Sequence, residues 1–366
     1  MPRLNRRSFL GNVAGLAGST LAGCSSSQST TQELRIFCYA GGHEQQLRAV
    51  FLPEFERQTG AKATLYPGWW DGIPKLKAAP ESDPPFDLMV SDATQGYPAV
   101  REGLFAALDF NNIPNVNKQA KATLKNWVIE NGYGLTYPDS VMTLAYHRKM
   151  VKTPPTRWAD LLTIADENQL GLYQSFYLSL YTFAAMLADT ENQAGQAANW
   201  INTRTDEVFR FARQHRERVK LWWPTTTDMI LALNNRQCTA GNMHSPEYYT
   251  ALKEKPELGA TVPEKDRAFV QVFWSIPVGS RNRQLAEQAI NIMFSDDVQL
   301  GLAKYGSATA NLNVASKMAE SDPFWKSLYP HTEEQFQSLQ YYPYDYYAAH
   351  WDELANEWER TVLRKS

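Results

Sequence analysis

Short apolar segments alternate with helical patterns in the first part of the chain. Segments 34–39, 61–66 and 86–90 are rich in apolar residues, and we expect them to be strands. Apolar residues recur at helical spacing over 47–55, and 73–79 has the length of a short helix. Because strands that alternate with helices form βαβ units, this pattern predicts a mostly parallel sheet and an α/β fold.

The rest of the chain is predicted to be more helical. The expected elements are a pair of strands around 134–146, helices over 158–188, 197–219, 228–233, 284–305 and 347–362, and single strands over 238–243 and 269–277. Neither an internal repeat nor a coiled-coil pattern is found in the sequence.

Length and composition narrow the class of protein. With 366 residues and 43% hydrophobic content, the chain is long enough for two packed lobes. This excludes a disordered tail, a collagen and a disulfide-stapled miniprotein. Lys and Arg number 36 against 39 Asp and Glu, without a long basic run. Since nucleic-acid backbones require clustered cations, a nucleic-acid partner is not expected.

The N-terminus has the features of an export signal. Arg6-Arg7 precedes an apolar stretch, 9–22, that is rich in Gly and Ala and too short to span a bilayer. This arrangement resembles a twin-arginine (Tat) signal peptide. The sequence Leu21-Ala22-Gly23-Cys24 is similar to a bacterial lipobox, which implies acylation of Cys24. We therefore expect a lipoprotein of the periplasm or of the extracytoplasmic face of the bacterial membrane, tethered by the Ser-rich segment that follows Cys24.

The other two cysteines, Cys38 and Cys238, have no metal-binding spacing. An exported protein can join such a pair in a disulfide. Cys38 lies within an apolar predicted strand, however, and free cysteine is among the most buried residue types. The sequence favours buried thiols and leaves the pairing open.

Local signatures of catalysis are missing from the sequence. After the export signal there is no Gly-x-Ser-x-Gly elbow, His-Glu-x-x-His helix, P-loop or dinucleotide fingerprint, and no two histidines stand four residues apart. No metal or cofactor is predicted. A catalytic site dispersed along the chain stays possible, but the pattern favours binding over catalysis.

Several segments together carry a resemblance to a known family. They are 34–39 with Gly41-Gly42, Phe55-Glu56-Arg57-Gln58-Thr59-Gly60, Phe86-Asp87-Leu88-Met89-Val90, Glu102-Gly103-Leu104, Ile113-Pro114-Asn115, Trp158-Ala159-Asp160-Leu161, Ser275-Ile276-Pro277 and Ala310-Asn311. In this order they resemble the extracellular solute-binding proteins of ABC importers, specifically the spermidine/putrescine-binding group of type II periplasmic binding proteins.

The resemblance implies a two-lobe α/β fold with a hinge, in which a small ligand lies in the cleft between the lobes. It also implies a monomer that delivers its ligand to an ABC permease in the membrane. The expected division is a signal peptide over 1–23, a tether over 24–33, lobe 1 over 34–138 with 269–308, and lobe 2 over 139–268 with 309–366.

Candidate ligand contacts follow from the ends of the predicted strands, which face the cleft in this fold. By this rule the candidates are Tyr39, His43, Trp69, Trp70, Asp71, Ser91, Asp92, Trp222 and His244. The resemblance adds Tyr137, Asp139 and Gln174, the last within Gln174-Ser175-Phe176-Tyr177. We expect Asp71 and Asp92 on one wall with Trp70. A carboxylate beside aromatic rings favours an amine, so the sequence predicts a polyamine or another organic cation.

Two features depart from the polyamine-binding pattern. The stretch 270–274 lacks the expected carboxylate, and uncharged residues stand at 174–175, where a second acid is expected. The Tyr-rich segment 341–347 raises ferric iron as an alternative ligand, because phenolate oxygens are hard donors. A receptor for an organic cation is the leading hypothesis. A ferric-iron receptor of the same fold and an exported hydrolase are the alternatives.

Overall fold

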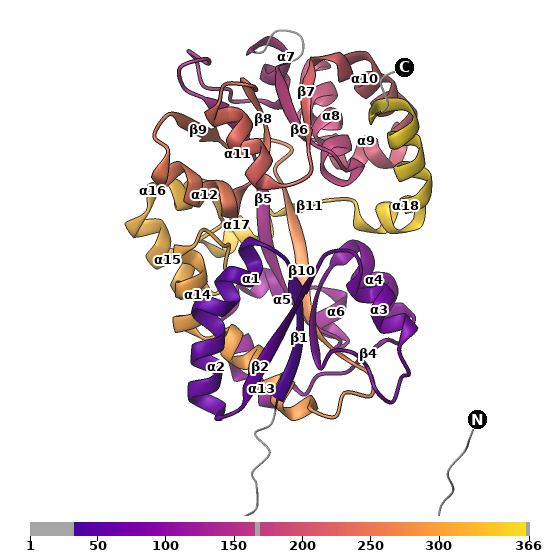
Figure 1. Cartoon of the computed structure of the whole chain (residues 1–366), viewed down its shortest axis with the longest axis vertical. Coiled ribbons are helices and arrows are strands. Elements are labelled where there is room, and N and C mark those ends of the chain that lie inside the picture. The colour runs from indigo at the N-terminus through magenta and orange to yellow at the C-terminus, as the bar shows by residue number, and fades with distance from the viewer. Residues whose placement is uncertain (1–32, 165–168, 364–366) are drawn as a thin grey trace, which may run out of the picture. The chain divides into compact units, whose positions relative to one another are not determined.

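The computed structural model describes residues 33–164 and 169–363 (Figure 1). The predicted signal peptide, Cys24 and most of the tether lie outside these residues, so these features stay predictions. Among the helices of the described ranges, none has the length and apolar character needed to cross a membrane.

The described strands form one mixed sheet with the order β2-β1-β3-β10-β5-β8-β6-β7, while β4 and β11 pair with β10 and β9 pairs with β5. The strands are β1 (Glu33–Tyr39), β2 (Lys62–Gly68), β3 (Leu88–Asp92), β4 (Phe105–Ala106), β5 (Leu135–His147), β6 (Leu170–Tyr173), β7 (Val219–Trp223), β8 (Ala240–His244), β9 (Leu258–Thr261), β10 (Ala268–Pro277) and β11 (Gln340–Tyr341). Pairing is parallel among β1, β2 and β3 and among β6, β7 and β8, but antiparallel between β3, β10, β5 and β8. The prediction of a mostly parallel sheet is therefore correct for the strands at both ends of the sheet and wrong for the strands at its centre.

Helices cover the sheet in both halves (Figure 1). They are α1 (Gly42–Gln46), α2 (Leu52–Thr59), α3 (Gly72–Ala78), α4 (Ala93–Arg101), α5 (Lys121–Leu124), α6 (Trp127–Glu130), α7 (Leu161–Ile164), α8 (Phe176–Thr190), α9 (Ala197–Thr203), α10 (Thr205–His215), α11 (Thr226–Asn234), α12 (Ser245–Glu254), α13 (Arg283–Met293), α14 (Asp296–Lys304), α15 (Leu312–Ser321), α16 (Pro323–Leu328), α17 (Glu333–Gln337) and α18 (Tyr344–Trp358).

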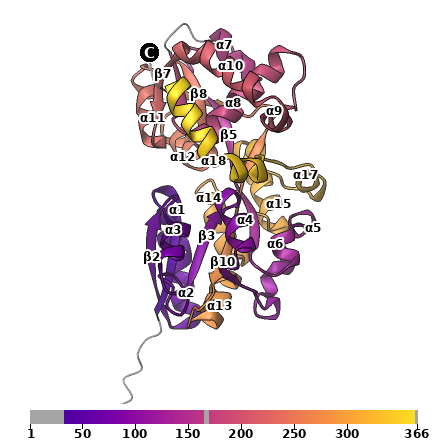
Figure 2. The same cartoon turned by 90° about the vertical axis from the view of Figure 1, so that its right-hand side faces the viewer.

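Two long strands connect the two halves of the fold. Strands β1 to β4 lie in the first half and β6 to β9 in the second, while β5 and β10 run between them (Figure 1). The first part of β5, up to Val141, pairs with β10, and the part from Met142 onward pairs with β8 and β9. The predicted pair of strands over 134–146 is therefore wrong. This segment is a single long strand that pairs with different strands along its two parts. Helix α18 packs on α4 of the first half and α8 of the second (Figure 2).

Two helical predictions also differ from the structure. The expected helix over 284–305 is interrupted at Ser295, whose side chain accepts a hydrogen bond from the Val298 amide and caps α14. The expected helix over 158–188 contains the buried strand β6 before α8 begins. A short apolar run has no periodicity of its own, so the pattern did not separate this strand from the helix after it.

The core is continuous across both halves, and it includes both remaining cysteines. Cys38 and Cys238 are fully buried free thiols, which confirms the buried assignment and excludes a disulfide between them. Burial raises the pKa of Cys38 to about 12 and that of Cys238 to about 11. Both thiols are therefore chemically inert in the folded protein.

We predict that Gly241→Ala strongly destabilises the protein. Gly241 of β8 pairs with Gly171 of β6, and a Cβ atom at 241 would collide with the backbone carbonyl oxygen of Gly171. We expect a loss of about 2–3 kcal/mol in the free energy of unfolding, measured by urea denaturation. Gly60→Ala is the control, since Gly60 has φ of 68° but open space around it, and should lose only about 1 kcal/mol. Equal losses in the two variants would contradict the proposed clash.

Candidate ligand-binding site

One cavity lies where strand ends from both halves meet. It has a volume of about 100 Å³ and is bordered by the ends of β1, β3, β6 and β8 and by residues of β5 and β10. Its lining consists of Tyr39, Ala40, His43, Trp69, Trp70, Asp92, Asp139, Ser140, Tyr173, Tyr177, Leu178, His244, Pro246, Glu247 and Val270. Ligands in α/β folds bind at the carboxyl ends of strands, so this cavity is the candidate site.

Asp92 is held by both halves of the fold. It ends β3 and caps α4, where its Oδ1 accepts a hydrogen bond of 2.7 Å from the Thr94 amide. The hydroxyl of Tyr177, in the first turn of α8, donates a bond of 2.6 Å to Oδ2. Burial raises the pKa of Asp92 to about 6, against the opposing effect of these two donors. Asp92 thus connects the two halves directly beside the cavity.

Two further carboxyl groups, Asp139 and Glu247, line the same cavity. Burial, followed by the charges of Glu247 and Asp92, raises the pKa of Asp139 to about 7. Burial also raises the pKa of Glu247. Glu247 belongs to α12 of the second half but reaches α1 of the first, since a Cβ atom at Gly42 would lie 3.3 Å from its Oε1.

The lining offers no permanent positive charge to these acids. None of the described residues that border the cavity is Lys or Arg. Burial lowers the pKa of His43 and of His244 to about 4, so both imidazoles are neutral near pH 7. His43 Nδ1 accepts a hydrogen bond of 3.2 Å from the Tyr39 amide. Asp92 is buried and Asp139 and Glu247 are half-buried, and three such carboxyl groups without a cation favour protonation or the binding of a positive charge.

Aromatic rings form much of the wall. Trp69 is 57% exposed at the mouth of the cavity and stacks on Tyr39 with 5.6 Å between the ring centroids. Trp70 meets Tyr177 edge-on at 5.5 Å. Tyr173 closes the side formed by β6. Such rings attract cations through their π faces, which adds to the attraction of the carboxylates.

The sequence profile of the bacterial extracellular solute-binding proteins matches residues 52–328. The chain belongs to this family. Members of this solute-binding family bind small ligands and deliver them to ABC permeases. The family and the two-lobe α/β fold expected from the sequence are both confirmed.

Solved structures of other solute-binding proteins share this fold. The GABA receptor Atu4243 has a TM-score of 0.75 and 18% identity, covering 92% of this chain and 99% of its own. The spermidine/putrescine-binding protein PotD of Streptococcus pneumoniae has a TM-score of 0.70 and 18% identity over 90% of this chain and 99% of its own. MotA of A. tumefaciens B6, solved with glucopine, has a TM-score of 0.71 and 13% identity, covering 90% of this chain and 100% of its own. No curated protein matches the chain. Identities this low establish the fold and leave the ligand of this solute-binding protein open.

Seven of the predicted contacts lie together in the cavity of this solute-binding protein. They are Tyr39, His43, Trp69, Trp70, Asp92, Asp139 and His244. Their roles in ligand binding stay predictions, but the strand-end rule brought them to one place.

Asp71 does not lie on the predicted wall. Its side chain is 48% exposed, forms an ion pair of 2.5 Å with Lys75, and accepts a hydrogen bond of 2.8 Å from the Trp69 amide. It stabilises the turn into α3, so its carboxylate is directed along that helix instead of into the cavity. Gln174 is also outside the lining: its side chain is exposed, and its carbonyl oxygen accepts a bond from Trp358 Nε1.

Three other predicted contacts are packed elsewhere. Ser91 is buried within β3, and side chains alternate along a strand, so it is directed away from its neighbour Asp92. Tyr137 packs edge-on against Phe294, with 5.9 Å between the ring centroids. Trp222 packs in the same way against Trp358, at 5.4 Å. Ser91 was thus assigned to the same face as its neighbour Asp92, when only Asp92 reaches the cavity.

Eight lining residues were not among the predicted contacts, and three of them, Tyr173, Tyr177 and Glu247, carry hydroxyl or carboxyl groups with a bearing on the ligand. Tyr177 lies in the segment 174–177, where Gln174 was predicted instead, and Tyr173 belongs to the unrecognised strand β6. Glu247 lies in the first turn of α12, three residues after His244. A signal was present in the sequence, because the first turn of a helix that follows a strand also faces the cleft in this fold.

The Tyr-rich segment is not part of this cavity. Tyr342, Tyr344 and Tyr347 are buried, and the Tyr344 hydroxyl donates a hydrogen bond of 3.1 Å to the Phe269 carbonyl oxygen. Tyr342 packs against Tyr177, with 5.4 Å between the ring centroids. In the described part of the chain no group of three or more His, Cys, Asp or Glu residues can hold a metal ion. The ferric-iron alternative is therefore not favoured.

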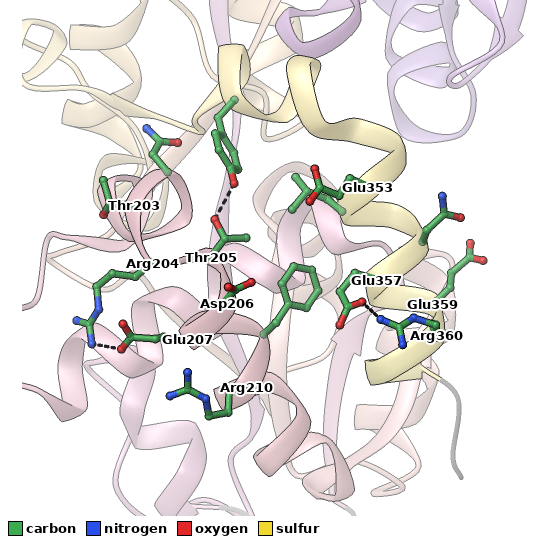
Figure 3. Close-up of a pocket in the computed structure, with 15 residues that line it drawn as sticks. Thr203, Arg204, Thr205, Asp206, Glu207, Arg210, Glu353, Glu357, Glu359 and Arg360 are labelled. Carbon is green, nitrogen blue, oxygen red and sulfur yellow. Dashed lines mark hydrogen bonds and ion pairs between the residues drawn. The ribbon is translucent and has the colours of Figure 1, made fainter.

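A larger cavity of about 1060 Å³ lies between α10 and α18 (Figure 3). Several of its charged side chains pair with one another, as Arg204 does with Glu207 and Arg360 with Glu357 (Figure 3). It is not formed by the strand ends that border the small cavity, and three arginines in its lining offset most of the charge of its five acids. We therefore assign the ligand site to the smaller cavity.

We predict that Tyr177→Phe raises the pKa of Asp92 further, because the lost hydroxyl is one of two donors that favour the charged carboxylate. The shift should be about one pKa unit, read from the Asp92 carboxyl carbon in an NMR titration. Tyr173→Phe is the matched control, since Tyr173 lines the same cavity without a hydrogen bond from its hydroxyl to Asp92. A Tyr177→Phe protein with an unchanged Asp92 pKa would show that the Tyr177–Asp92 bond is not formed in solution.

Proposed function

We propose that this protein captures a small organic cation of the polyamine class and delivers it to an ABC permease. The observation that carries the proposal is the charge of the cavity lining: three carboxyl groups, Asp92, Asp139 and Glu247, and no Lys or Arg among the described lining residues. An ammonium group would form charge-assisted hydrogen bonds with these acids and a cation–π contact with Trp70 or Tyr177.

The same lining disfavours ligands that carry their own carboxylate. Solved relatives include a receptor for GABA and a protein that binds glucopine, and each of those ligands has an acidic group. Such a group requires a cationic partner, usually Arg or Lys. Here the two nearest candidates, His43 and His244, are neutral at pH 7. We therefore place this protein closer in specificity to the spermidine/putrescine-binding relative.

The size of the cavity supports a short cation. A water molecule takes up roughly 30 Å³ in the liquid. A cavity of about 100 Å³ therefore has room for roughly three water molecules. A diamine as short as putrescine suits this volume better than a longer polyamine.

Capture needs no covalent chemistry. The lining comes from both halves of the fold, so a bound cation would favour the arrangement in which Asp92 and Tyr177 are joined, and the permease would recognise that closed form. We propose the hinge at the crossings of β5 and β10, with lobe 1 over 34–138 and 269–308 and lobe 2 over 139–268 and 309–366. We further propose a monomer, anchored outside the cytoplasmic membrane by lipid on Cys24, that has no enzymatic activity.

The charge of the lining gives a direct test by isothermal titration calorimetry. Glu247→Gln and Asp139→Asn should each weaken the binding of putrescine or spermidine about ten- to a hundredfold, since each loses a charge-assisted contact. Asp71→Asn removes the same charge from an ion pair outside the cavity and should leave the affinity unchanged. GABA should produce no heat. Tighter binding of GABA than of putrescine, or an equal loss in Asp71→Asn, would contradict the proposal.

The affinity for the cation should also depend on pH. Asp139 and Asp92 have raised pKa values of about 7 and about 6, so both become protonated as the pH falls from 8 to 5.5. Protonation removes the charges that attract the ligand, whose amines stay charged over this range. We expect a loss of roughly tenfold or more in affinity between pH 8 and pH 5.5. The profile of Asp139→Asn should be flatter, and a flat profile in the unmodified protein would contradict the assignment.

A further inference from the structure

A second, separate cavity has the opposite charge. It has a volume of about 380 Å³ and lies between the start of β10, the end of α16 and the segment that follows α17. Its lining contains Lys265, Arg267 and Lys326 but only one acidic residue, Glu264. This excess of positive charge occurs in a chain whose net charge is −3.

The guanidinium of Arg267 is the central group. It lies over the ring of Phe269, with Cζ 5.5 Å from the centroid, and Nη2 donates to the carbonyl oxygens of Ser327, at 3.0 Å, and Leu328. These carbonyls end α16, so part of the guanidinium has a structural role. Its Nε, however, is buried and has no hydrogen-bond partner. Burial lowers the pKa of Arg267 to about 10.

No carboxylate of the described residues lies within 4.0 Å of Lys265, Arg267 or Lys326. The adjacent Asp266 is directed elsewhere, because its two oxygens accept hydrogen bonds from the Gly195 and Ala197 amides. Arg267 is half-buried with its Nε fully buried, and a guanidinium that is partly removed from water is normally paired with an acid. Here the pairing group is missing while two more cations border the same space.

A neutral hydrogen-bond donor, the side-chain amide of Gln335, also lines this cavity. The side-chain oxygen of Gln335 accepts hydrogen bonds from the His331 and Thr332 amides, at 2.8 and 3.3 Å. Its amide nitrogen is therefore left as a donor at the cavity wall. A guanidinium, two ammonium groups and an amide donor are the side-chain types that bind tetrahedral oxyanions.

We propose that this cavity is a binding site for a phosphate-like oxyanion, held by Arg267 with Lys265 and Lys326. The site is independent of the cation cavity and does not rest on the function proposed for it. The phosphate group can belong to free inorganic phosphate or to a phospholipid headgroup, since both present the same oxygens to these cations.

The experiment titrates the full chain with inorganic phosphate at constant ionic strength, using chloride as the reference anion, and follows binding by calorimetry. Lys265 and Lys326 are exposed and unpaired within the described structure, so the double variant K265Q/K326Q should fold normally. We expect it to bind phosphate roughly fivefold more weakly. Arg267→Gln should abolish the binding, while Arg267→Lys should retain part of it.

The matched control is K62Q/K220Q, which removes the same net charge from two exposed lysines outside this cavity. It should bind phosphate as the parent does, and putrescine titrations should be equal in all these variants. A water-soluble short-chain phosphatidylglycerol forms a second arm, and binding of this lipid alone, lost in K265Q/K326Q, would identify the headgroup as the source. Phosphate binding no stronger than chloride binding, without lipid binding, would overturn the proposal, as would equal losses in the two double variants.

Discussion

The antiparallel pairing of β5 with β10 determines where everything else in this structure lies. Both strands cross from one half to the other, and every residue of β10 is buried, so the pair forms a fixed base between two groups of parallel strands. Asp139 of β5 and Val270 of β10 line the cavity at this crossing. Most of the other lining residues come from strand ends and from the loops and first helical turns that follow them. Because both strands run between the halves, the proposed hinge lies at these two strands.

The carboxyl groups of the cavity lower the stability of the folded protein, and the same groups would attract the proposed cation. Burying Asp92, Asp139 and Glu247 together disfavours their charged forms, as the raised pKa values show. Asp92 recovers part of this loss through the Thr94 amide and the Tyr177 hydroxyl. A structure optimised only for stability would replace such groups with apolar ones. Their concentration at the junction of the two halves supports the proposed capture of a cation, which would supply the missing positive charge and contact both halves.

The sequence predicted the sheet better than it predicted side-chain direction. Strands β1, β2 and β3 have strong apolar patterns and clear ends, so the residues that follow them, such as His43 and Trp70, were found correctly near one another. The rule failed within a strand or turn, where Asp71 pairs locally with Lys75. It also failed where β6 was merged into a helix, which concealed Tyr173. A shift of one residue in the register of a strand turns each side chain to the opposite face of the sheet. Apolar patterns at strand ends do not determine the register to within one residue.

The near-neutral composition of the chain conceals two regions of unbalanced charge. The cation cavity has three acids and no Lys or Arg in its described lining, while the cavity at Arg267 has three cations and one acid. The positive groups do not neutralise the acids, because the cavities share no lining residue and Asp266, the acid next to Arg267, is used by the backbone of α9 instead. Exposed charges such as those of Lys265 and Lys326 cost little when unpaired, but at buried positions such as Asp92 and the Nε of Arg267 an unpaired charge is disfavoured. The fold keeps these charges apart in space, and each set remains available to a ligand of opposite sign.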